Sequence, residues 1–181
     1  MPSWPSIARR IRVPLGFAFT IIYLWIAKPT FISLAEGAAL IVPGLIVRAL
    51  ASGHVQKNEQ LATSGPYAYT RNPLYLGSLI LAVGFGVAAR SWWIAVGIVL
   101  MFFAIYWPVI KAEEEFLRGK FSQYAEYAAH VPRLFPRLLP FGESEGKFSP
   151  ELYRKHREYN ALLGSLAILA ALLVKMILLR A

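Results

Sequence analysis

Apolar residues are concentrated in five long runs, each bounded by charged residues, proline or glycine. A bilayer core about 30 Å thick needs roughly 20 mostly apolar residues in a helix. The runs come close to this length, and the first and third reach it by borrowing polar flanking residues. They predict membrane-spanning helices at residues 13–27, 31–50, 75–89, 92–110 and 160–179.

The connections between these runs alternate between very short and long. Lys28-Pro29-Thr30 joins the first pair and Arg90-Ser91 joins the third and fourth, whereas residues 51–74 and 111–159 are long and polar. This spacing predicts two helical hairpins and a further span. The expected organisation is therefore an N-terminal transmembrane hairpin (1–50), a core of one loop, two spans and a following helix (51–141), and a linker with a C-terminal transmembrane helix (142–181).

Positive charge is distributed unevenly over the two ends of the expected spans. Of the 19 Lys and Arg residues, all but Lys28, Arg90, Lys175 and Arg180 fall at the N-terminus or on the side of the long segments. Cytoplasmic loops of membrane proteins carry an excess of Lys and Arg. We therefore expect a multi-pass integral membrane protein whose long loops face the cytoplasm, together with any site for a soluble cofactor.

The composition agrees with this topology and excludes several functions. Hydrophobic residues make up 57% of the 181 residues and charged residues 16%, against about a quarter charged in soluble domains. The net charge of +9 follows the topology and does not indicate nucleic-acid binding. There is no cysteine, and the three histidines show no metal-ligand spacing, so we expect no disulfide and no metal site. The predicted fold class is an all-α integral membrane bundle of about five transmembrane helices.

The segment LATSGPYAYTRNPLYLG, residues 61–77, combines a turn with a helix start. Gly65-Pro66 predicts the turn, Asn72 suits the N-cap of the third span, and Pro73 suits its first position, where no N–H is needed. Arg71 and the positive helix end then face one spot on the cytoplasmic side, which favours an anion. On its own, this segment is more typical of a well-capped membrane helix than of a binding site.

A second polar segment follows the fourth span. Glu113, Glu114 and Glu115 sit where that span leaves the membrane, and apolar residues then recur at helical spacing up to Val131-Pro132. We expect the helix of the fourth span to continue to this point. Acidic residues at the cytoplasmic end of a helix oppose both the positive-inside bias and the helix dipole. A positive group should lie near them, and the candidates are Arg71, Lys111 and a cationic cofactor.

Taken together, these segments resemble the membrane methyltransferase family that includes isoprenylcysteine carboxyl methyltransferase and the phospholipid N-methyltransferases. The resemblance covers about residues 48–141 and lies in the order and spacing of several motifs. The segment with His54 and Asn58 also resembles the loop before the turn in the carboxyl methyltransferases. The matching motifs are Gly65-Pro66-Tyr67, Arg71-Asn72-Pro73 with Tyr75 and Gly77, Glu113-Glu114, and Phe121, Tyr124, Tyr127, Val131-Pro132 and Pro136.

This resemblance implies a fold unrelated to soluble methyltransferases, with a cytoplasmic pocket for S-adenosylmethionine. Arg71, Asn72 and Tyr75 would form the wall near its methionine part and are the expected catalytic residues, with Arg71 positioning an anionic acceptor. Glu113 and Glu114 would bind the ribose hydroxyls or the amino group. The cofactor-binding residues that the resemblance implies are Leu61, Thr63, Tyr67, Arg71, Asn72, Gly84, Gly86, Glu113 and Glu114.

Two features depart from the family pattern. Asn72 stands where the family has histidine, which keeps hydrogen bonding but removes a titrating group, so it cannot act as a base. The fifth span lies beyond the pattern and has small residues at four-residue spacing, such as Ala161 and Ser165. It could close the site or mediate homodimerisation, and we favour plain packing against the other spans.

The expected function is S-adenosylmethionine-dependent methylation of a lipophilic or lipidated acceptor that enters from the membrane lipids. Carboxyl methylation of a prenylcysteine-like substrate is favoured, because a carboxylate needs no base. Phospholipid N-methylation, of the phosphatidylethanolamine type, is the alternative within the family. Two other classes stay open: an NADPH-dependent sterol-reductase-like protein, and a non-catalytic membrane scaffold.

Overall fold

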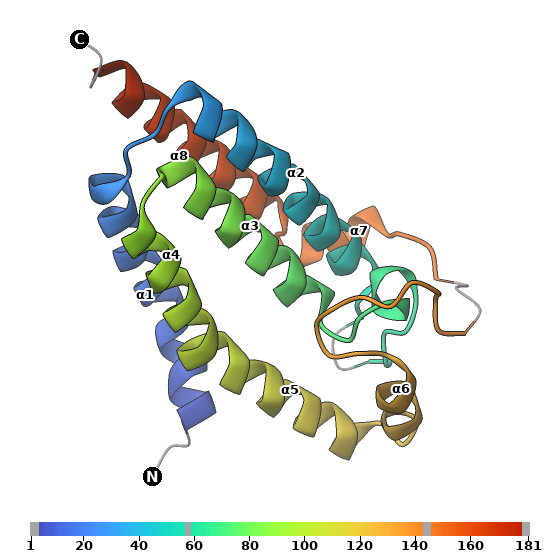
Figure 1. Ribbon diagram of the computed structural model, residues 1–181. Helices are drawn as coiled ribbons and strands as arrows, with labels where there is room; N and C mark the ends of the chain where they lie inside the picture. Colours follow the sequence, from blue (N-terminus) through green and yellow to red (C-terminus); the bar gives the residue numbers. More distant parts are fainter. Residues whose placement is uncertain (1–3, 57–58, 143–145, 179–181) are drawn as a thin grey trace.

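The computed structural model describes residues 4–56, 59–142 and 146–178, so Asn58 and Arg180 lie outside the described residues. The described chain is helical and contains no strand. Figure 1 shows the helices as an elongated, splayed bundle. They are α1 (Trp4–Ile26), α2 (Phe31–His54), a 3₁₀ turn (Gly65–Ala68), α3 (Pro73–Ala89), α4 (Trp92–Met101), a π-helical segment (Phe102–Tyr106), α5 (Trp107–Lys120), α6 (Tyr124–His130), α7 (Pro150–Lys155) and α8 (Tyr159–Leu178).

The five predicted spans all fall on helices, which confirms the prediction of an all-α membrane bundle. Within the described residues, 3 helices are long and apolar enough to cross a membrane: Phe31–His54, Trp92–Lys120 and Tyr159–Leu178. The helices of two predicted spans do not meet these criteria of length and composition. Helix α3 is apolar but has only 17 residues, and the first half of α1 contains basic residues. That α1 and α3 also cross the membrane stays a prediction.

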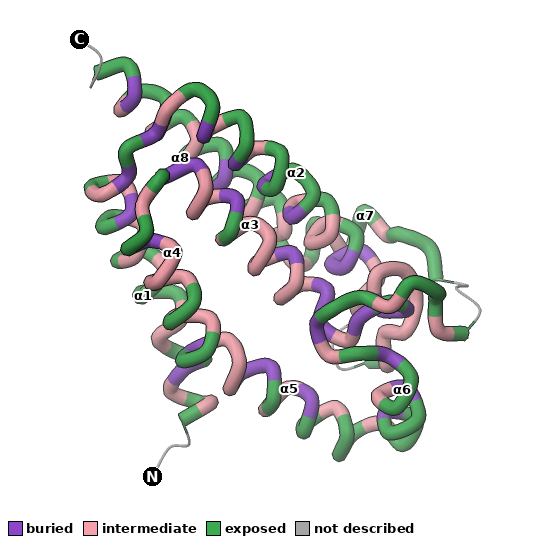
Figure 2. Tube along the Cα trace, viewed as in Figure 1, coloured by how far each residue is buried: buried purple, intermediate pink, exposed green. Residues whose placement is uncertain are grey.

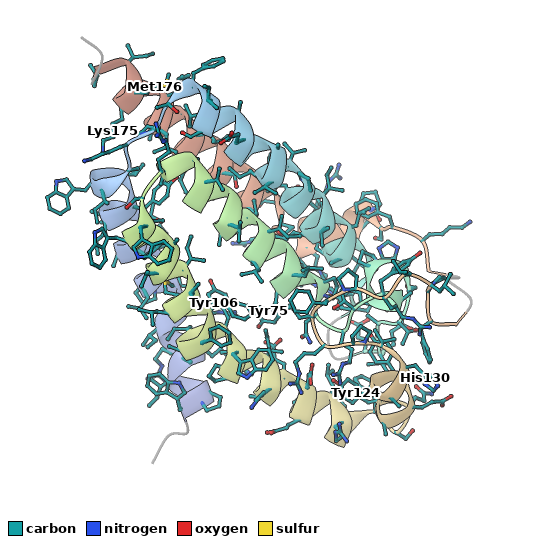
Figure 3. All side chains as sticks on the ribbon, in the orientation of Figure 1. Tyr75, Tyr106, Tyr124, His130, Lys175 and Met176 are labelled. Atoms are coloured by element: carbon teal, nitrogen blue, oxygen red, sulfur yellow. The ribbon has the colours of Figure 1, made fainter. Side chains whose placement is uncertain are left out.

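The two predicted hairpin turns lie side by side. The Lys28 N–H donates to the Ala89 carbonyl at 2.9 Å, so the turn before α2 contacts the end of α3. The ammonium of Lys175 on α8 donates to the carbonyl oxygens of Leu24 and Trp25, each at 2.7 Å (Figure 3). We call this end of the bundle the turn end. The opposite end carries the start of α1, the end of α2 and the long connections, and we call it the loop end (Figure 1).

Helices α2 and α3 pack very closely because glycines face each other. A Cβ added to Gly37 would lie 2.7 Å from the Gly84 carbonyl oxygen, and one added to Gly44 would lie 3.0 Å from the Gly77 carbonyl oxygen. Small residues allow such close backbone approach between membrane helices. Helices α3 and α5, in contrast, diverge toward the loop end (Figure 1).

Much of the outer surface is apolar, as expected for helices that face lipid. Figure 2 shows many exposed positions along α1 and α2, with buried positions where α2 and α3 face each other. At the turn end Trp25, Trp92 and Trp93 are exposed, a placement typical of aromatic anchors at a membrane interface.

The prediction of one continuous helix from the fourth span to Val131-Pro132 is wrong in one respect. The helix ends at Lys120, Phe121 is extended (φ −119°, ψ 117°), and a separate helix, α6, runs from Tyr124 to His130. The break lets Tyr124 and Tyr127 pack with Val131 in a buried cluster with Leu61. The predicted stop at Val131-Pro132 is confirmed.

Candidate functional site

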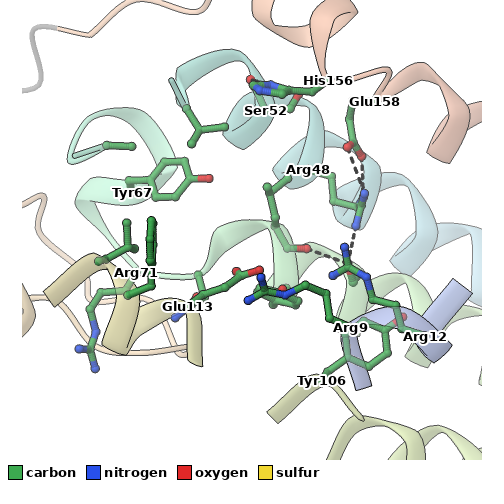
Figure 4. A pocket seen from close by; sticks show the side chains of 18 of the residues that line it. Arg9, Arg12, Arg48, Ser52, Tyr67, Arg71, Tyr106, Glu113, His156 and Glu158 are labelled. Atoms are coloured by element: carbon green, nitrogen blue, oxygen red, sulfur yellow. Dashed lines mark hydrogen bonds and ion pairs between the residues drawn. The ribbon is translucent and has the colours of Figure 1, made fainter. Parts of the chain in front are cut away.

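A cavity of about 940 Å³ occupies the space between the diverging helices. Residues of α1, α2, α3, α5 and α6 line it, together with the loop after α2 and the segment before α8. Its volume lies at the upper end of the range of about 300–1,000 Å³ that is usual for small-molecule sites. Figure 4 shows charged and aromatic side chains from several of these elements directed into it.

The structure brings together many of the residues that the family resemblance implies. Those on the cavity wall come from the loop, the start of α3 and the end of α5. They are Leu61, Tyr67, Arg71, Asn72, Tyr75 and Glu113. The remaining ones, Thr63, Gly84, Gly86 and Glu114, are not among the residues that line the cavity.

Glu114 is buried behind the cavity wall and holds three segments together. Its Oε1 accepts from Asn72 Nδ2 at 2.8 Å, and its Oε2 accepts from Arg133 Nε at 2.9 Å and forms an ion pair with Arg133 Nη2 at 2.9 Å. Arg71 Nη1 lies 3.6 Å from the same oxygen. Of the expected cations, Arg71 is therefore confirmed as a neighbour of the acidic cluster, whereas Arg133 was missed because it lies beyond α6 in the sequence.

Asn72 occupies the predicted N-cap position of α3, and Pro73 follows at the first position of the helix. Its side chain nevertheless makes no capping hydrogen bond, contrary to the prediction. The Asn72 amide donates instead to Glu114 and, at 3.0 Å, to the Arg133 carbonyl oxygen. The buried carboxylate needs donors, and the Asn72 amide, held by the two hydrogen bonds that its Nδ2 donates, does not accept from the helix N–H groups through Oδ1.

Two buried polar atoms near Glu114 have no hydrogen-bond partner among the described residues: Arg71 Nε and the Tyr124 hydroxyl. The two groups are close enough to influence each other electrostatically, without hydrogen-bond geometry. Both residues line the cavity. Because buried polar atoms normally have partners, these two are available to a bound molecule.

Three tyrosines form the loop-end wall of the cavity. The Tyr127 hydroxyl donates to the Tyr67 carbonyl oxygen at 2.8 Å, and the Tyr124 and Tyr127 rings meet edge to face. Burial raises the pKa of each phenol, and the nearby Glu113 carboxylate adds to this for Tyr67. These tyrosines stay neutral at physiological pH and offer aromatic faces and hydroxyl groups.

Glu113 points into the cavity, one helical step from Glu114. Consecutive residues of a helix differ in direction by about 100° because 3.6 residues make one turn. The Tyr75 hydroxyl lies close enough to both the Glu113 carboxylate and the Arg12 guanidinium to interact with them electrostatically. Figure 4 shows Glu113, Arg9 and Arg12 directed into the same part of the cavity.

Tyr75 also meets Tyr106, which the sequence did not single out as a site residue. The two rings are edge to face, with centroids 6.1 Å apart (Figure 3). Tyr106 ends the π-helical segment between α4 and α5. Such π segments change the direction of the residues that follow and occur often at functional sites.

A further polar group comes from the segment before α8. Arg48 Nε donates to Glu158 Oε1 at 2.6 Å, and Arg48 also hydrogen-bonds with Ser78 on α3. His156 Nδ1 lies 3.0 Å from the Ser52 carbonyl oxygen. Arg48, His156 and Glu158 line the cavity. Sequence reasoning missed them because the partners are separated by about a hundred residues.

Gly84 and Gly86 lie at helix contacts away from the cavity. A Cβ on Gly84 would approach Ile41 Cγ1 to 2.8 Å, and one on Gly86 would approach Ile98 Cδ1 to 3.2 Å. Their positions account for close packing of α3 on its neighbours. The role toward a cofactor that the resemblance implies for them receives no support from their place in the fold.

The fold and the site define a class of protein: a helical membrane bundle with a charged, tyrosine-lined cavity between its diverging helices. No group of three or more His, Cys, Asp or Glu residues that could hold a metal ion occurs in the described part of the chain.

Comparison with known proteins assigns the chain to a family within this class. The model of the phospholipid methyltransferase family matches residues 11–124, and the chain belongs to this family. This match confirms the membrane methyltransferase resemblance.

Two curated bacterial proteins are similar to the chain. The cobalt-zinc-cadmium resistance protein CzcN of Cupriavidus metallidurans is 41% identical over 90 residues, which cover 49% of this chain and 42% of that protein. The nickel-cobalt-cadmium resistance protein NccN of Alcaligenes xylosoxydans xylosoxydans is 36% identical over 86 residues, covering 48% of this chain and 40% of that protein. The match thus spans about two fifths of the length of each relative. No solved structure matches the chain.

Proposed function

We propose that this protein transfers methyl groups from S-adenosylmethionine to a lipophilic acceptor in a membrane. The chain belongs to a methyltransferase family, and the observation that carries the proposal is the set of side chains that line its cavity. Its loop-end part is lined by tyrosines and charged groups, and its other part continues between α1 and α3 along Phe17 and Leu74. The first part suits a polar donor, and the second suits a lipid chain.

The loop-end residues fit S-adenosylmethionine. Arg71 Nε and the Tyr124 hydroxyl, both without partners in the described chain, would donate to its carboxylate. Glu113, which forms no ion pair with another described residue, would accept from its amino group or ribose hydroxyls. Tyr67 and Leu61 would enclose the nucleoside. When bound, S-adenosylmethionine supplies a methyl group on a positively charged sulfur.

Carboxyl methylation of a prenylcysteine-like substrate is the favoured reaction. The new bond joins a carboxylate oxygen to the methyl carbon, the carbon–sulfur bond breaks, and its electron pair stays on sulfur, so no proton is released. The residues then need only orient the carboxylate and exclude water. The cavity suits this requirement because it is rich in arginine and has the non-titrating Asn72 beside Arg71.

Methylation of the amine of a phosphatidylethanolamine-type lipid is the second candidate. The matching family is that of the phospholipid methyltransferases, which favours this reaction. The Glu113 carboxylate also favours it, because this reaction needs a proton acceptor. An ammonium must lose a proton before its nitrogen attacks, and the unpaired Glu113 carboxylate could accept it. This route releases one proton for each methyl group transferred.

The loop end faces the cytoplasm in this proposal, where S-adenosylmethionine is available. The supporting observation is charge: Arg9, Arg12, Arg71 and Arg133 lie at the loop end, whereas Lys28, Arg90 and Lys175 lie at the turn end. The names of the two relatives describe resistance to metal ions, which is a cellular trait and identifies no methyl acceptor.

Isothermal titration of the detergent-purified full chain tests cofactor binding. We expect heat with S-adenosylhomocysteine, a roughly tenfold or greater loss of affinity in Glu113→Gln, and no change in Glu115→Gln, whose side chain is exposed on the same helix. Absence of heat with S-adenosylmethionine and S-adenosylhomocysteine at high micromolar concentration would overturn the proposal. Binding of NADPH instead would indicate a reductase-like protein, and equal affinity in wild type, Glu113→Gln and Arg71→Ala would indicate a scaffold.

Methyl transfer to a lipid panel identifies the acceptor. The protein is incubated with methyl-labelled S-adenosylmethionine and either a farnesylcysteine analogue or phosphatidylethanolamine. Label that alkali releases as methanol is a methyl ester, whereas label that resists alkali, with one proton released for each methyl group, is an N-methyl group. The first result supports carboxyl methylation and the second replaces it with amine methylation.

A further inference from the structure

We propose that Arg9 and Arg12 on α1 hold the anionic head of an amphiphilic acceptor, and that a groove along the same face of α1 holds its apolar chain. This inference rests on the proposed function and names the substrate class of the same cavity. The ligand chemistry is a carboxylate or phosphate attached to an apolar chain.

The first observation is the state of the cavity arginines. Arg48 is paired with Glu158, and Arg71 lies 3.6 Å from Glu114. Arg9 and Arg12 also line the cavity, but neither has a carboxylate partner within ion-pair distance among the described residues. Arg71, the residue expected to position an anionic acceptor, already has part of its charge balanced, so the two α1 arginines are the better anchors for a second anion.

The second observation is their position on the helix. Residues three and four apart share one face of a helix, and Arg9 and Arg12 are three apart. The same face continues with the other α1 residues that line the cavity, which are Val13, Gly16, Phe17 and Thr20. From Arg9 to Thr20 the helix rises about 16 Å, at 1.5 Å for each residue. A charged end and a long, mostly apolar extension thus form one continuous stripe.

The third observation is the space beside Gly16. A Cβ added to Gly16 would meet no other atom within 4 Å, although Gly16 lines the cavity. Phe17 lines the cavity and is 71% exposed, so it lies at the rim, where the groove meets the outer surface of the bundle. This surface faces lipid in the membrane-spanning arrangement. The groove can therefore receive an apolar chain sideways from the bilayer.

The fourth observation joins this groove to the site of methyl transfer. Arg12, Tyr75 and Glu113 line the same part of the cavity, with the Tyr75 hydroxyl close to both charged groups, and Glu113 belongs to the part that fits the donor (Figure 4). An anion held by Arg12 would lie next to that part. A carboxylate bound there is itself the methyl acceptor, whereas a phosphate bound there would place a neighbouring amine near the donor.

Binding to the detergent-purified full chain tests the subsite directly. The probes are N-acetyl-farnesylcysteine and phosphatidylethanolamine, with farnesol as a chain without a charge and inorganic phosphate as a charge without a chain. We expect the double variant Arg9→Gln/Arg12→Gln to weaken binding of N-acetyl-farnesylcysteine, or of phosphatidylethanolamine through its phosphate, about tenfold or more, and to leave farnesol unaffected. The control is Arg10→Gln, which removes one positive charge from an exposed residue on the same helix that does not line this cavity.

A second variant tests the groove without changing any charge. Gly16→Leu fills open space and replaces glycine by a better helix former, so the fold should be retained. We expect it to weaken the farnesyl compound several-fold and to leave inorganic phosphate unchanged. If Arg9→Gln/Arg12→Gln binds the amphiphiles as Arg10→Gln does, or if Gly16→Leu binds them as the wild type does, the subsite is refuted.

Cofactor titration separates this inference from the proposed function. Both variants should bind S-adenosylhomocysteine with nearly wild-type affinity, since neither replaces a residue that is proposed to contact the cofactor. A chain that binds anionic amphiphiles through Arg9 and Arg12 but no S-adenosylhomocysteine would refute the methyltransferase function and retain the subsite. If S-adenosylhomocysteine binds normally but the variants do not change the affinity for the amphiphiles, the subsite is refuted and the methyltransferase function is retained.

Discussion

The adjacent residues Glu113 and Glu114 should respond in opposite ways to the same substitution. Glu114→Gln removes the negative charge that faces Arg133 at 2.9 Å and Arg71 at 3.6 Å, in a side chain that is 9% exposed. Breaking a buried ion pair by removing one partner costs about 3–5 kcal/mol. The Arg133 side chain is 35% exposed and can regain water, so we expect the lower end, about 3 kcal/mol of unfolding free energy. Glu113→Gln leaves these contacts intact.

Thermal unfolding of the two variants in the same detergent measures this difference. At about 2–4 °C for each kcal/mol in a chain of this size, Glu114→Gln should unfold about 6–12 °C below the wild type. Glu113→Gln should unfold within about 2 °C of the wild type and should lose affinity for S-adenosylhomocysteine. A Glu114→Gln protein of unchanged stability that no longer binds S-adenosylhomocysteine would refute the assignment, because Glu114 would then be a cofactor ligand and not the residue that holds Asn72, Arg71 and Arg133 together.

Three further predictions follow from the packing and the buried groups. Gly84→Val should lower the unfolding temperature much more than Gly86→Ala, because its side chain would collide with Ile41 and the α2 backbone; equal stability with reduced cofactor affinity would point to a direct cofactor contact. A double-mutant cycle of Arg48→Gln and Glu158→Gln should give a coupling energy of about 1–3 kcal/mol in unfolding experiments, and additive effects would contradict the ion pair at 2.6 Å. Burial raises the pKa of Tyr127 above its ordinary value, so above about pH 10 this phenol ionises in the unfolded state but not in the folded state. The free energy of unfolding should therefore fall as the pH rises above about 10. Tyr127→Phe should make this fall less steep.

The hydrophobic pattern predicted the helices well because run length and turn residues act locally. Each of the five apolar runs became part of a helix, and the two short connections became hairpin turns. The turn before α2 is closed by a reciprocal pair of hydrogen bonds between Thr30 and Ser33, which are three residues apart. Such features depend on neighbours in the sequence and are therefore visible in it.

The break at Phe121–Gln123 could not be predicted in the same way. Helical spacing continues through this segment, but the chain gains more by burying Tyr124 and Tyr127 against Leu61 and Val131 than by extending α5. Leu61 lies on a loop that precedes two spans. The helix therefore ends because of a contact that only the folded chain provides.

What the sequence by itself determined is the membrane bundle, its hairpins, the basic loop end and the motifs of the phospholipid methyltransferase family. Only the tertiary structure decided the roles of the individual charges. It buried Glu114 against Arg133 while directing Glu113 into the cavity, and it brought Arg9 and Arg12 from the first helix to the same space. The physical reason is that a helix turns adjacent residues in different directions, and the partner each one meets comes from a helix or loop distant in the sequence.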